Sequence, residues 1–347
     1  MLLVLLQHAG LEQNLLGSAG VTMFFVISGF VITNLSLAEA SATGSFAIAD
    51  FYLRRALKLL PPLFAFIVVP SLLIGFASNW VAINPNYLLS QILFYYNSVI
   101  IQGKVGVLPG TDVIWSLSVE EQFYIGFAVL WLICLRLRRP QLALVWLASV
   151  SFVLANVLRF VLTAEGKLDY APRIYFSTVT RMDAIAAGVL IAIVIRSQAW
   201  ANLKSRVTPL LWDGLLFSSV AVLACSLLAG DNTANYSWLI TIHVATTACI
   251  ALVGFSGSSA LLARIFMKLS ENRAFRFIGI ASYSIYLVHH PLSLLIAPMV
   301  SSLPALLAIF LRFGIGLAAG IGAWWLVERP IEQFKNQRLT RGWRVIA

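Results

Sequence analysis

Long apolar runs separated by short polar stretches make up most of the chain. We place apolar segments at 1–9, 18–37, 58–79, 87–102, 117–135, 141–163, 179–196, 208–229, 238–257, 276–298 and 304–327. Most of them approach the ~20 apolar residues with which a helix crosses ~30 Å of hydrocarbon. The pattern therefore predicts an all-α, polytopic integral membrane protein.

Positive charge in the connecting stretches predicts the topology. Lys and Arg gather near Arg54, Arg136, Arg196 and Arg264 and again in the tail 335–347. By the positive-inside rule, these five stretches face the cytoplasm. If every apolar segment crossed, the basic stretch around Arg136 would lie on the same side as the uncharged loop 80–86. We therefore expect that one segment between these two loops does not cross.

The segment 87–102 is the one that we expect not to cross, because it is short and is interrupted by Tyr95–Ser98. It is predicted to be re-entrant or interfacial, which is tolerable when buried against protein. About ten crossings remain, with both termini cytoplasmic. The stretch Ala38–Asp50 is rich in small residues, and we interpret it as a linker. Loops predicted on the outer face are 10–17, 103–116, 164–178, 230–237 and 299–303.

Composition excludes a soluble protein. Of 347 residues, 60% are hydrophobic and only 11% are charged, whereas a soluble domain carries roughly a quarter. The net charge of +10 matches cytoplasmic loops, and no basic patch interleaved with aromatics indicates a nucleic-acid partner. Cys134, Cys225 and Cys249 lie in or beside apolar runs without metal-like spacing, so neither a disulfide nor a metal site is expected.

The chain begins inside an apolar run, "MLLVLLQHAG", without a basic start, so no cleavable signal peptide is expected. A crossing of about nine residues is far too short. We expect this run to be the end of a first helix whose upstream part is missing.

Ionisable groups within membrane segments are costly and usually face a cavity or a partner. His8 stands at the outer end of the first segment, where a catalytic imidazole and an interfacial anchor are both compatible with the sequence. In "GVTMFFVISGFVIT", Ser28 and Gly29 interrupt bulky residues. They admit either a close ligand or a neighbouring helix.

The stretch "FYLRRALKLLPPLF" carries Arg54, Arg55 and Lys58 before a Pro-Pro step. The two prolines suit the first turn of a crossing helix or a kink. Anionic lipid headgroups and a phosphate-rich cofactor are both suitable partners for such a basic trio.

The stretch "WSLSVEEQFY" places two adjacent carboxylates, Glu120 and Glu121, at the mouth of a membrane segment. With Ser116 or Ser118 as the cap, both acids occupy the first turn, where a helix N-terminus stabilises negative charge. Capping accounts for one carboxylate. The second, together with Tyr124, predicts a polar pocket.

The late segment "IGIASYSIYLVHHPL" places Ser282, Tyr286 and His289 on one helical face. Pro291 removes a backbone hydrogen bond beside both histidines and bends the helix there. For His290, a structural role and a chemical one are equally compatible with the sequence.

Together these stretches resemble the acyltransferase 3 family of membrane-bound acyltransferases. The resemblance runs in order through "LLVLLQHAG", "GVTMFFVISGFVIT", "RRALKLLPPL", "WSLSVEEQFY", "TRMDAIAAGVLIA", "SYSIYLVHHPL" and "VERPIEQF". It implies about ten crossings, with residues 1–334 forming the acyltransferase domain and 335–347 a basic cytoplasmic tail. One departure is that the family's first helix usually carries an Arg about three turns before its His, and this chain begins too close to His8 to show it.

The resemblance implies transfer of an acyl group, commonly acetyl from acetyl-coenzyme A, to a hydroxyl of a surface polysaccharide, a lipid-linked glycan or a small metabolite. The acyl-coenzyme A is a substrate, and no permanently bound cofactor or metal is expected. A bacterial inner membrane is the expected location, and the chain resembles the stand-alone members without an added hydrolase-like domain.

O-acylation needs a base, oxyanion donors and a cationic seat for coenzyme A phosphates. We expect His8 to be the base, with Glu120 or Glu121 orienting it or binding the acceptor. Direct transfer and an acyl-His intermediate both stay open. The phosphate ligands expected are Arg54, Arg55 and Lys58, with Arg181 as a further cation. Residues expected to line the substrate cavity are Ser28, Ser116, Ser118, Tyr124, Asp183, Ser282, Tyr286 and His289.

The alternative function is a proton-coupled transporter or flippase of a glycan or glycolipid. Intramembrane His and Glu residues would then relay protons. No inverted repeat is visible in the hydropathy, and acetyl transfer in membranes would separate the two classes.

Overall fold

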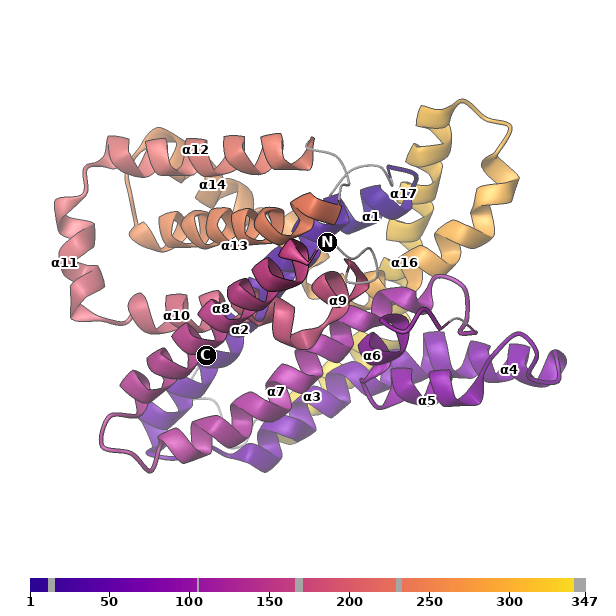
Figure 1. Cartoon of the computed structure of the whole chain (residues 1–347), viewed down its shortest axis with the longest axis horizontal. Coiled ribbons are helices and arrows are strands. Elements are labelled where there is room, and N and C mark those ends of the chain that lie inside the picture. The colour runs from indigo at the N-terminus through magenta and orange to yellow at the C-terminus, as the bar shows by residue number, and fades with distance from the viewer. Residues whose placement is uncertain (12–15, 105, 166–170, 229–232, 340–347) are drawn as a thin grey trace. The chain divides into compact units, whose positions relative to one another are not determined.

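A computed structural model describes the chain except residues 12–15, 105, 166–170, 229–232 and 340–347 (Figure 1). The described part is helical and contains no strand, which confirms the predicted all-α class. Nine helical stretches in it are long and apolar enough to cross a membrane, so the chain is a polytopic integral membrane protein. They are Gly17–Thr43, Ile48–Ala77, Thr111–Cys134, Pro140–Ala164, Ala171–Val194, Pro209–Leu227, Ser237–Ser256, Ser282–Val300 and Ala305–Phe334.

Two of the predicted segments are not among these nine. The segment 1–9 corresponds to α1 (Leu2–His8), whose seven residues are too few to cross a bilayer alone. The segment 87–102 is split into α5 (Pro85–Ile92) and α6 (Tyr96–Ile100), with Phe94 between them at a positive φ of 55°. The predicted interruption of that segment is thus confirmed.

The chain forms two compact units. Unit 1 consists of Met1–Glu12, Glu39–Tyr124 and Ile278–Ala347, and unit 2 of Gln13–Ala38 and Ile125–Phe277. Three helices contribute residues to both: α2 (Leu16–Thr43), α7 (Trp115–Cys134) and α15 (Arg273–Ile280).

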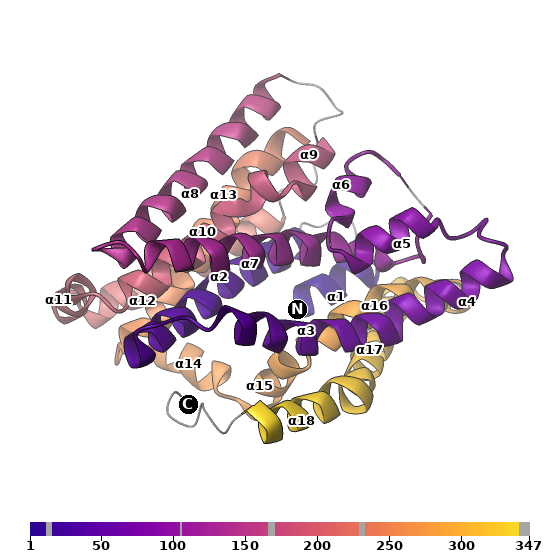
Figure 2. The ribbon, with the colours of Figure 1, turned by 90° about the horizontal axis from the view of Figure 1, so that it is seen from below.

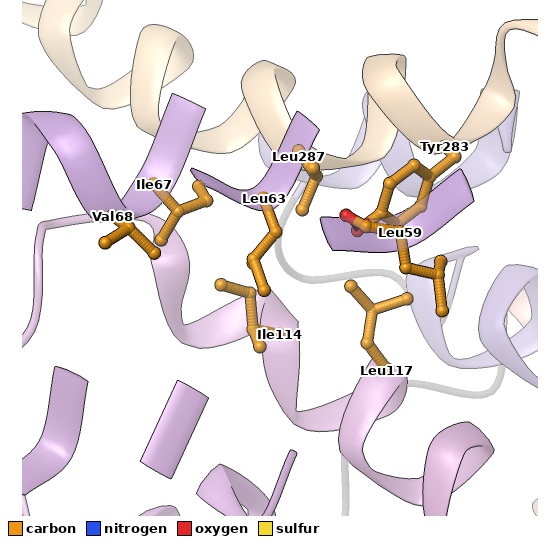
Figure 3. Close-up of a cluster of buried hydrophobic side chains, with 8 residues drawn as sticks. All are labelled: Leu59, Leu63, Ile67, Val68, Ile114, Leu117, Tyr283 and Leu287. Atoms are coloured by element: carbon orange, nitrogen blue, oxygen red, sulfur yellow. Dashed lines mark hydrogen bonds between the residues drawn. The ribbon is translucent and has the colours of Figure 1, made fainter. Parts of the chain in front are cut away.

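Unit 1 is held together by apolar side chains from helices that are far apart in sequence. Besides α1, α5, α6 and the start of α7, it contains α3 (Ile48–Leu63), η1 (Phe64–Val68), α4 (Val69–Ala77), η2 (Thr111–Ile114), α16 (Ser282–Ile296), η4 (Ala297–Val300), α17 (Ala305–Ala323), η5 (Trp324–Glu328) and α18 (Arg329–Leu339). One apolar cluster, drawn in Figure 3, joins α3, η1, η2, α7 and α16. The members are Leu59, Leu63, Ile67, Val68, Ile114, Leu117, Tyr283 and Leu287.

Small residues bring α16 and α17 close together, and the two helices lie side by side in Figure 1 and Figure 2. A Cβ on Gly320 would lie only 2.5 Å from the Cα of Ile285, and one on Gly316 would touch the Cβ of His289 at 3.6 Å. Glycines four residues apart let membrane helices pack backbone to backbone. The histidine-bearing helix is therefore held against α17 by close contact.

The basic trio and the prolines lie inside a long helix, which corrects the prediction that a crossing starts near residue 58. Because α3 begins at Ile48, Pro61 and Pro62 are interior residues and not part of a first turn. The backbone continues into the π turn η1. Proline cannot donate a backbone hydrogen bond, and such turns are a usual adjustment to a disturbed ladder.

The predicted linker Ala38–Asp50 is mostly helical, so that prediction was wrong. The helix α2 continues to Thr43, as its alanines favour. Buried Glu39 then accepts a 2.8 Å hydrogen bond from the backbone N–H of Ala47. This contact connects the end of α2 to the start of α3.

Unit 2 contains α8 (Pro140–Ala164), α9 (Ala171–Phe176), α10 (Thr178–Val194), α11 (Gln198–Arg206), α12 (Pro209–Leu227), α13 (Thr233–Ser256) and α14 (Leu261–Ser270). Within it, α8 packs on α10, and α12 lies along α13 (Figure 1). Gly29 on α2 and Gly188 on α10 allow a close crossing, since a Cβ on either would overlap the carbonyl of Ile185 or Val26, respectively. Gly29 thus serves helix packing, one of its two predicted roles.

Candidate functional site

Three imidazoles meet in unit 1 and form what we call the histidine cluster, His8, His289 and His290. His8 ends α1, and its Nδ1 lies 2.9 Å from Nε2 of His289 on α16. Its ring also stacks on that of His290, with 4.0 Å between centroids and 16° between planes. The sequence predicted functions for His8 and His289 separately, and the structure brings them into direct contact.

Backbone carbonyls orient His289. Its Nδ1 lies 2.7 Å from the carbonyl oxygen of Tyr286 and 3.2 Å from that of Ile285. The side chain is buried, with 2% of its surface exposed. Its ring is consequently held by hydrogen bonds at both nitrogens.

A second set of contacts holds the backbone of His8. The carbonyl oxygen of His8 accepts hydrogen bonds from Ser293 Oγ at 2.6 Å and from Arg312 Nη2 at 2.9 Å. Arg312 Nε also donates to Ser293 Oγ at 2.9 Å. Arg312 was not predicted, although a lone Arg inside the apolar segment 304–327 is the kind of signal that marks a functional position.

An aspartate that the sequence did not single out lies beside the histidine cluster. Asp112 Oδ1 on η2 is 3.3 Å from Nδ1 of His290. Burial, with the Asp112 charge adding to it, raises the pKa of Tyr96 to about 12, so this phenol stays protonated beside the carboxylate. Asp112 is a single acid in a predicted loop, and no spacing pattern distinguishes it there.

Tyr286 connects the start of α7 to α16. Its hydroxyl donates to the carbonyl of Val113 at 2.7 Å and lies 2.7 Å from Ser116 Oγ. The predicted capping roles of Ser116 and Ser118 are wrong. Helix α7 follows η2 directly, so these hydroxyls donate to the carbonyls of Val113 and Ile114 instead of accepting from backbone N–H groups.

The two adjacent carboxylates have different surroundings. Glu120 is buried and accepts a 2.7 Å hydrogen bond from the hydroxyl of Tyr124, one turn along α7. The guanidinium carbon of Arg55 lies 3.6 Å from the centroid of the Tyr124 ring. For Glu121, Oε1 is buried and has no hydrogen-bond partner within the described ranges. We call Glu120, Glu121, Tyr124 and Arg55 the carboxylate cluster.

A residue of α3 beside the basic trio contacts the first turn of α16. Tyr283 donates to the carbonyl of Leu59, next to Lys58, at 2.8 Å. Arg54 lies 3.9 Å from Glu39. At 1.5 Å of rise per residue, Tyr283 and His289 are about 9 Å apart along α16. Ser282, half-buried, begins the same helix.

Neither carboxylate of the carboxylate cluster contacts His8. In the part of the chain that the structure describes, the side chain of His8 contacts the rings of His289 and His290. The carboxylate of Asp112 lies 3.3 Å from Nδ1 of His290 in this cluster. The prediction that Glu120 or Glu121 orients His8 therefore has no contact to support it, whereas binding of an acceptor stays a prediction.

A family model described as an acyltransferase domain matches residues 2–329. The chain belongs to the acyltransferase 3 family. The match covers nearly the whole chain and includes most of both units and every predicted site residue. The resemblance expected from the sequence motifs is thus confirmed.

Named relatives of this acyltransferase 3 protein are bacterial. The chain is 27% identical over 299 residues to the peptidoglycan O-acetyltransferase OatA of Listeria monocytogenes, with 82% of this chain and 46% of the relative covered. It is 26% identical over 314 residues to the O-acetyltransferase OatA of Staphylococcus aureus, covering 83% and 48%. The chain spans about half the length of these relatives. No solved structure matches the chain.

The remaining predicted residues of this acyltransferase 3 chain lie in unit 2. Arg181 is fully buried and donates to Thr22 Oγ1 at 2.8 Å. Asp183 is also fully buried, and its two carboxylate oxygens accept from Arg159 at 2.9 and 2.5 Å. Ser28 is buried on α2. Phosphate binding by Arg181 and a place for Ser28 and Asp183 in a substrate cavity stay predictions.

Proposed function

We propose that this protein is an O-acetyltransferase that moves an acetyl group from acetyl-coenzyme A to a hydroxyl of a carbohydrate. The observation that carries the proposal is the histidine cluster, in which Nδ1 of His8 is hydrogen-bonded and Nε2 has no hydrogen-bond partner among the described residues. A histidine with one occupied and one available ring nitrogen suits general-base catalysis. The names of the relatives favour a cell-wall polysaccharide as the acceptor.

In the proposed reaction, His8 removes the proton of the acceptor hydroxyl while the hydroxyl oxygen attacks the thioester carbonyl. The C–O bond forms and a tetrahedral oxyanion results. When the oxyanion collapses, the C–S bond breaks, and the leaving thiolate takes the proton from the His8 imidazolium. The products are the acetyl ester and free coenzyme A, and His8 returns to its neutral form.

The basic trio Arg54, Arg55 and Lys58 is proposed to bind the phosphates of coenzyme A. Arg presents a planar fork of donors that matches phosphate oxygens. The contact of Tyr283 with Leu59 supports this role, because it puts Leu59, the neighbour of Lys58 in the sequence, about 9 Å along α16 from His289. The long arm of coenzyme A would cover that separation and deliver the thioester to His8.

We place the protein in a bacterial inner membrane with both termini in the cytoplasm, because the basic stretches then face inward. The trio lies on the cytoplasmic side in this topology, where acetyl-coenzyme A is made. Asp112 belongs to a loop on the outer side, so the histidine cluster lies toward the acceptor. The buried, unpaired Oε1 of half-buried Glu121 is proposed to bind a hydroxyl of that acceptor.

The test is transfer of radiolabelled acetyl from acetyl-coenzyme A into a purified peptidoglycan fraction by membranes that contain the protein, compared with membranes from the empty-vector strain. We expect label in ester linkage, released by mild base, only with the protein. Ester label at the empty-vector level would contradict the proposal. Protein-dependent uptake of a labelled glycan into vesicles, without any acetyl ester, would favour a transporter instead.

A further inference from the structure

We infer that His289 is a positioning residue that holds His8 in the tautomer with the proton on Nδ1, so that Nε2 of His8 is the base. The inference rests on the proposed function for the role of His8 in catalysis. The tautomer itself follows from hydrogen bonds within unit 1. It assigns to His289 a different role from that of lining a substrate cavity.

The first step is the proton on His289 Nδ1. This nitrogen lies 2.7 Å from the Tyr286 carbonyl oxygen and 3.2 Å from that of Ile285. A carbonyl oxygen can only accept a hydrogen bond. The hydrogen bonds therefore require that Nδ1 of His289 carries a proton.

The second step is the lone pair on His289 Nε2. The ring is buried, and the described groups around it include two more imidazoles, the Tyr286 ring and the Arg312 guanidinium that holds His8, while Asp112 contacts His290 and not His289. A second proton would place an imidazolium there without a carboxylate in contact, which is costly in an apolar interior. With His289 neutral and Nδ1 protonated, Nε2 accepts hydrogen bonds.

The third step transfers this constraint to His8. Nε2 of His289 lies 2.9 Å from Nδ1 of His8, so Nδ1 of His8 is the donor. A neutral imidazole carries a single ring proton, which leaves the lone pair on Nε2 of His8. His290 does not compete for that proton, since it stacks on the face of the His8 ring.

The same hydrogen bond would strengthen during catalysis. When Nε2 of His8 takes the acceptor's proton, the ring becomes an imidazolium whose Nδ1–H still points at His289. A hydrogen bond from a charged donor is roughly twice as strong as a neutral one. His289 would thus stabilise the charge on His8 as it develops, without itself contacting substrate.

The tautomer can be measured without any assay of activity. The chain has four histidines, His8, His243, His289 and His290. Their ring nitrogens can be observed by ¹⁵N NMR in detergent-solubilised protein labelled at histidine. The His8 signals are assigned by their loss in His8→Ala. We expect the wild-type protein to show a protonated Nδ1 and an unprotonated Nε2 at His8; a protonated Nε2 would overturn the inference.

Two substitutions of His289 separate positioning from packing. His289→Gln keeps an oxygen that can accept from His8, whereas His289→Met keeps the size and removes the strong acceptor. In His289→Met, we expect His8 to lose its preference for the Nδ1-protonated tautomer and kcat to fall on the order of 10² to 10⁴-fold, with KM nearly unchanged. In His289→Gln, we expect most of the tautomer preference and most of kcat to be retained. The inference would be overturned if folded His289→Gln and His289→Met lost kcat equally, or if His8 kept its tautomer in His289→Met.

These readouts also separate this inference from the proposed function. If the wild-type protein has no acetyltransferase activity, the proposed function fails, while the NMR tautomer of His8 still decides whether His289 positions the ring. If the activity is present and the tautomer is the opposite one, only the inference fails. Should His289→Met not fold, the wild-type spectrum decides alone.

Discussion

His8 and His290 stack face to face, with their ring centroids 4.0 Å apart. Oδ1 of Asp112 lies 3.3 Å from Nδ1 of His290. Two imidazolium rings at this distance would repel each other. The cluster therefore favours one charged imidazole at a time. The proposed reaction places that single charge briefly on His8.

Replacement of Asp112 with Asn should have a small effect. The Asp112 side chain is about half exposed, and ion pairs in contact with water contribute about 1 kcal/mol or less. We expect Asp112→Asn to reduce kcat/KM by less than about tenfold, because the amide keeps the shape of the side chain and removes only its charge. Steady-state kinetics check this, and a loss as deep as that of a His8 variant would show that the carboxylate has an essential role.

Substitution of Gly110 should disturb the contact between η2 and α16. Gly110 has a φ of +80°, and a Cβ there would lie 2.5 Å from the backbone nitrogen of Pro291. Backbone cannot move aside cheaply, so we expect Gly110→Ala to lower the thermal unfolding temperature in detergent and to reduce activity. The displacement would reach His290 and Asp112 first.

Gly103 offers a matched control for that substitution. Its φ of +66° is similarly left-handed, but no atom lies within 4 Å of a Cβ built there. Gly103→Ala should cost only the conformational strain of about 1–2 kcal/mol. If the two alanine variants unfold at the same temperature, the predicted clash at Gly110 is contradicted.

In unit 2, loss of one partner of the buried ion pair should destabilise the fold more than loss of both. Arg159 and Asp183 are both fully buried, and Arg159 also donates to Thr241 and to the carbonyl of Thr180. Removal of one partner from a buried pair typically costs about 3–5 kcal/mol, whereas replacement of both by apolar residues is often tolerated. We expect Asp183→Leu to reduce folded protein sharply and Arg159→Met/Asp183→Leu to recover much of it.

The yield of monodisperse protein and its thermal unfolding temperature measure this difference. Equal stability of the single and the double variant would show that the charges do not depend on each other. A stable Asp183→Leu protein that binds acceptor poorly would instead favour the predicted place of Asp183 in a substrate cavity.

The sequence predicted where most helices lie, because the hydropathy of a membrane segment is a local property. It failed where a helix continues beyond its apolar part. The polar start of α3 around Arg54 and the small-residue end of α2 near Glu39 are helical without being hydrophobic. In both places the helical propensity of the residues and contacts such as that of Glu39 with Ala47 decide the structure.

The sequence also predicted His8 and His289, but not their partners. Direct contacts between residues 281 positions apart, such as His8 and His289, depend on helix packing that no local pattern encodes. Asp112 sits in a short connecting helix without a motif of its own. Arg159 and Arg312 could have been found as lone charges in apolar segments, the same signal by which other intramembrane residues were chosen.

The central claim, that His8 is the base of an acetyl transfer, is tested most directly by the rate of labelled acetyl transfer with His8→Ala. The variant should be compared with wild-type protein at equal abundance and equal thermal unfolding temperature. We expect the ester label formed per minute to fall on the order of 10² to 10⁴-fold, as loss of a general base does. Transfer at the wild-type rate by a folded His8→Ala protein would contradict the account.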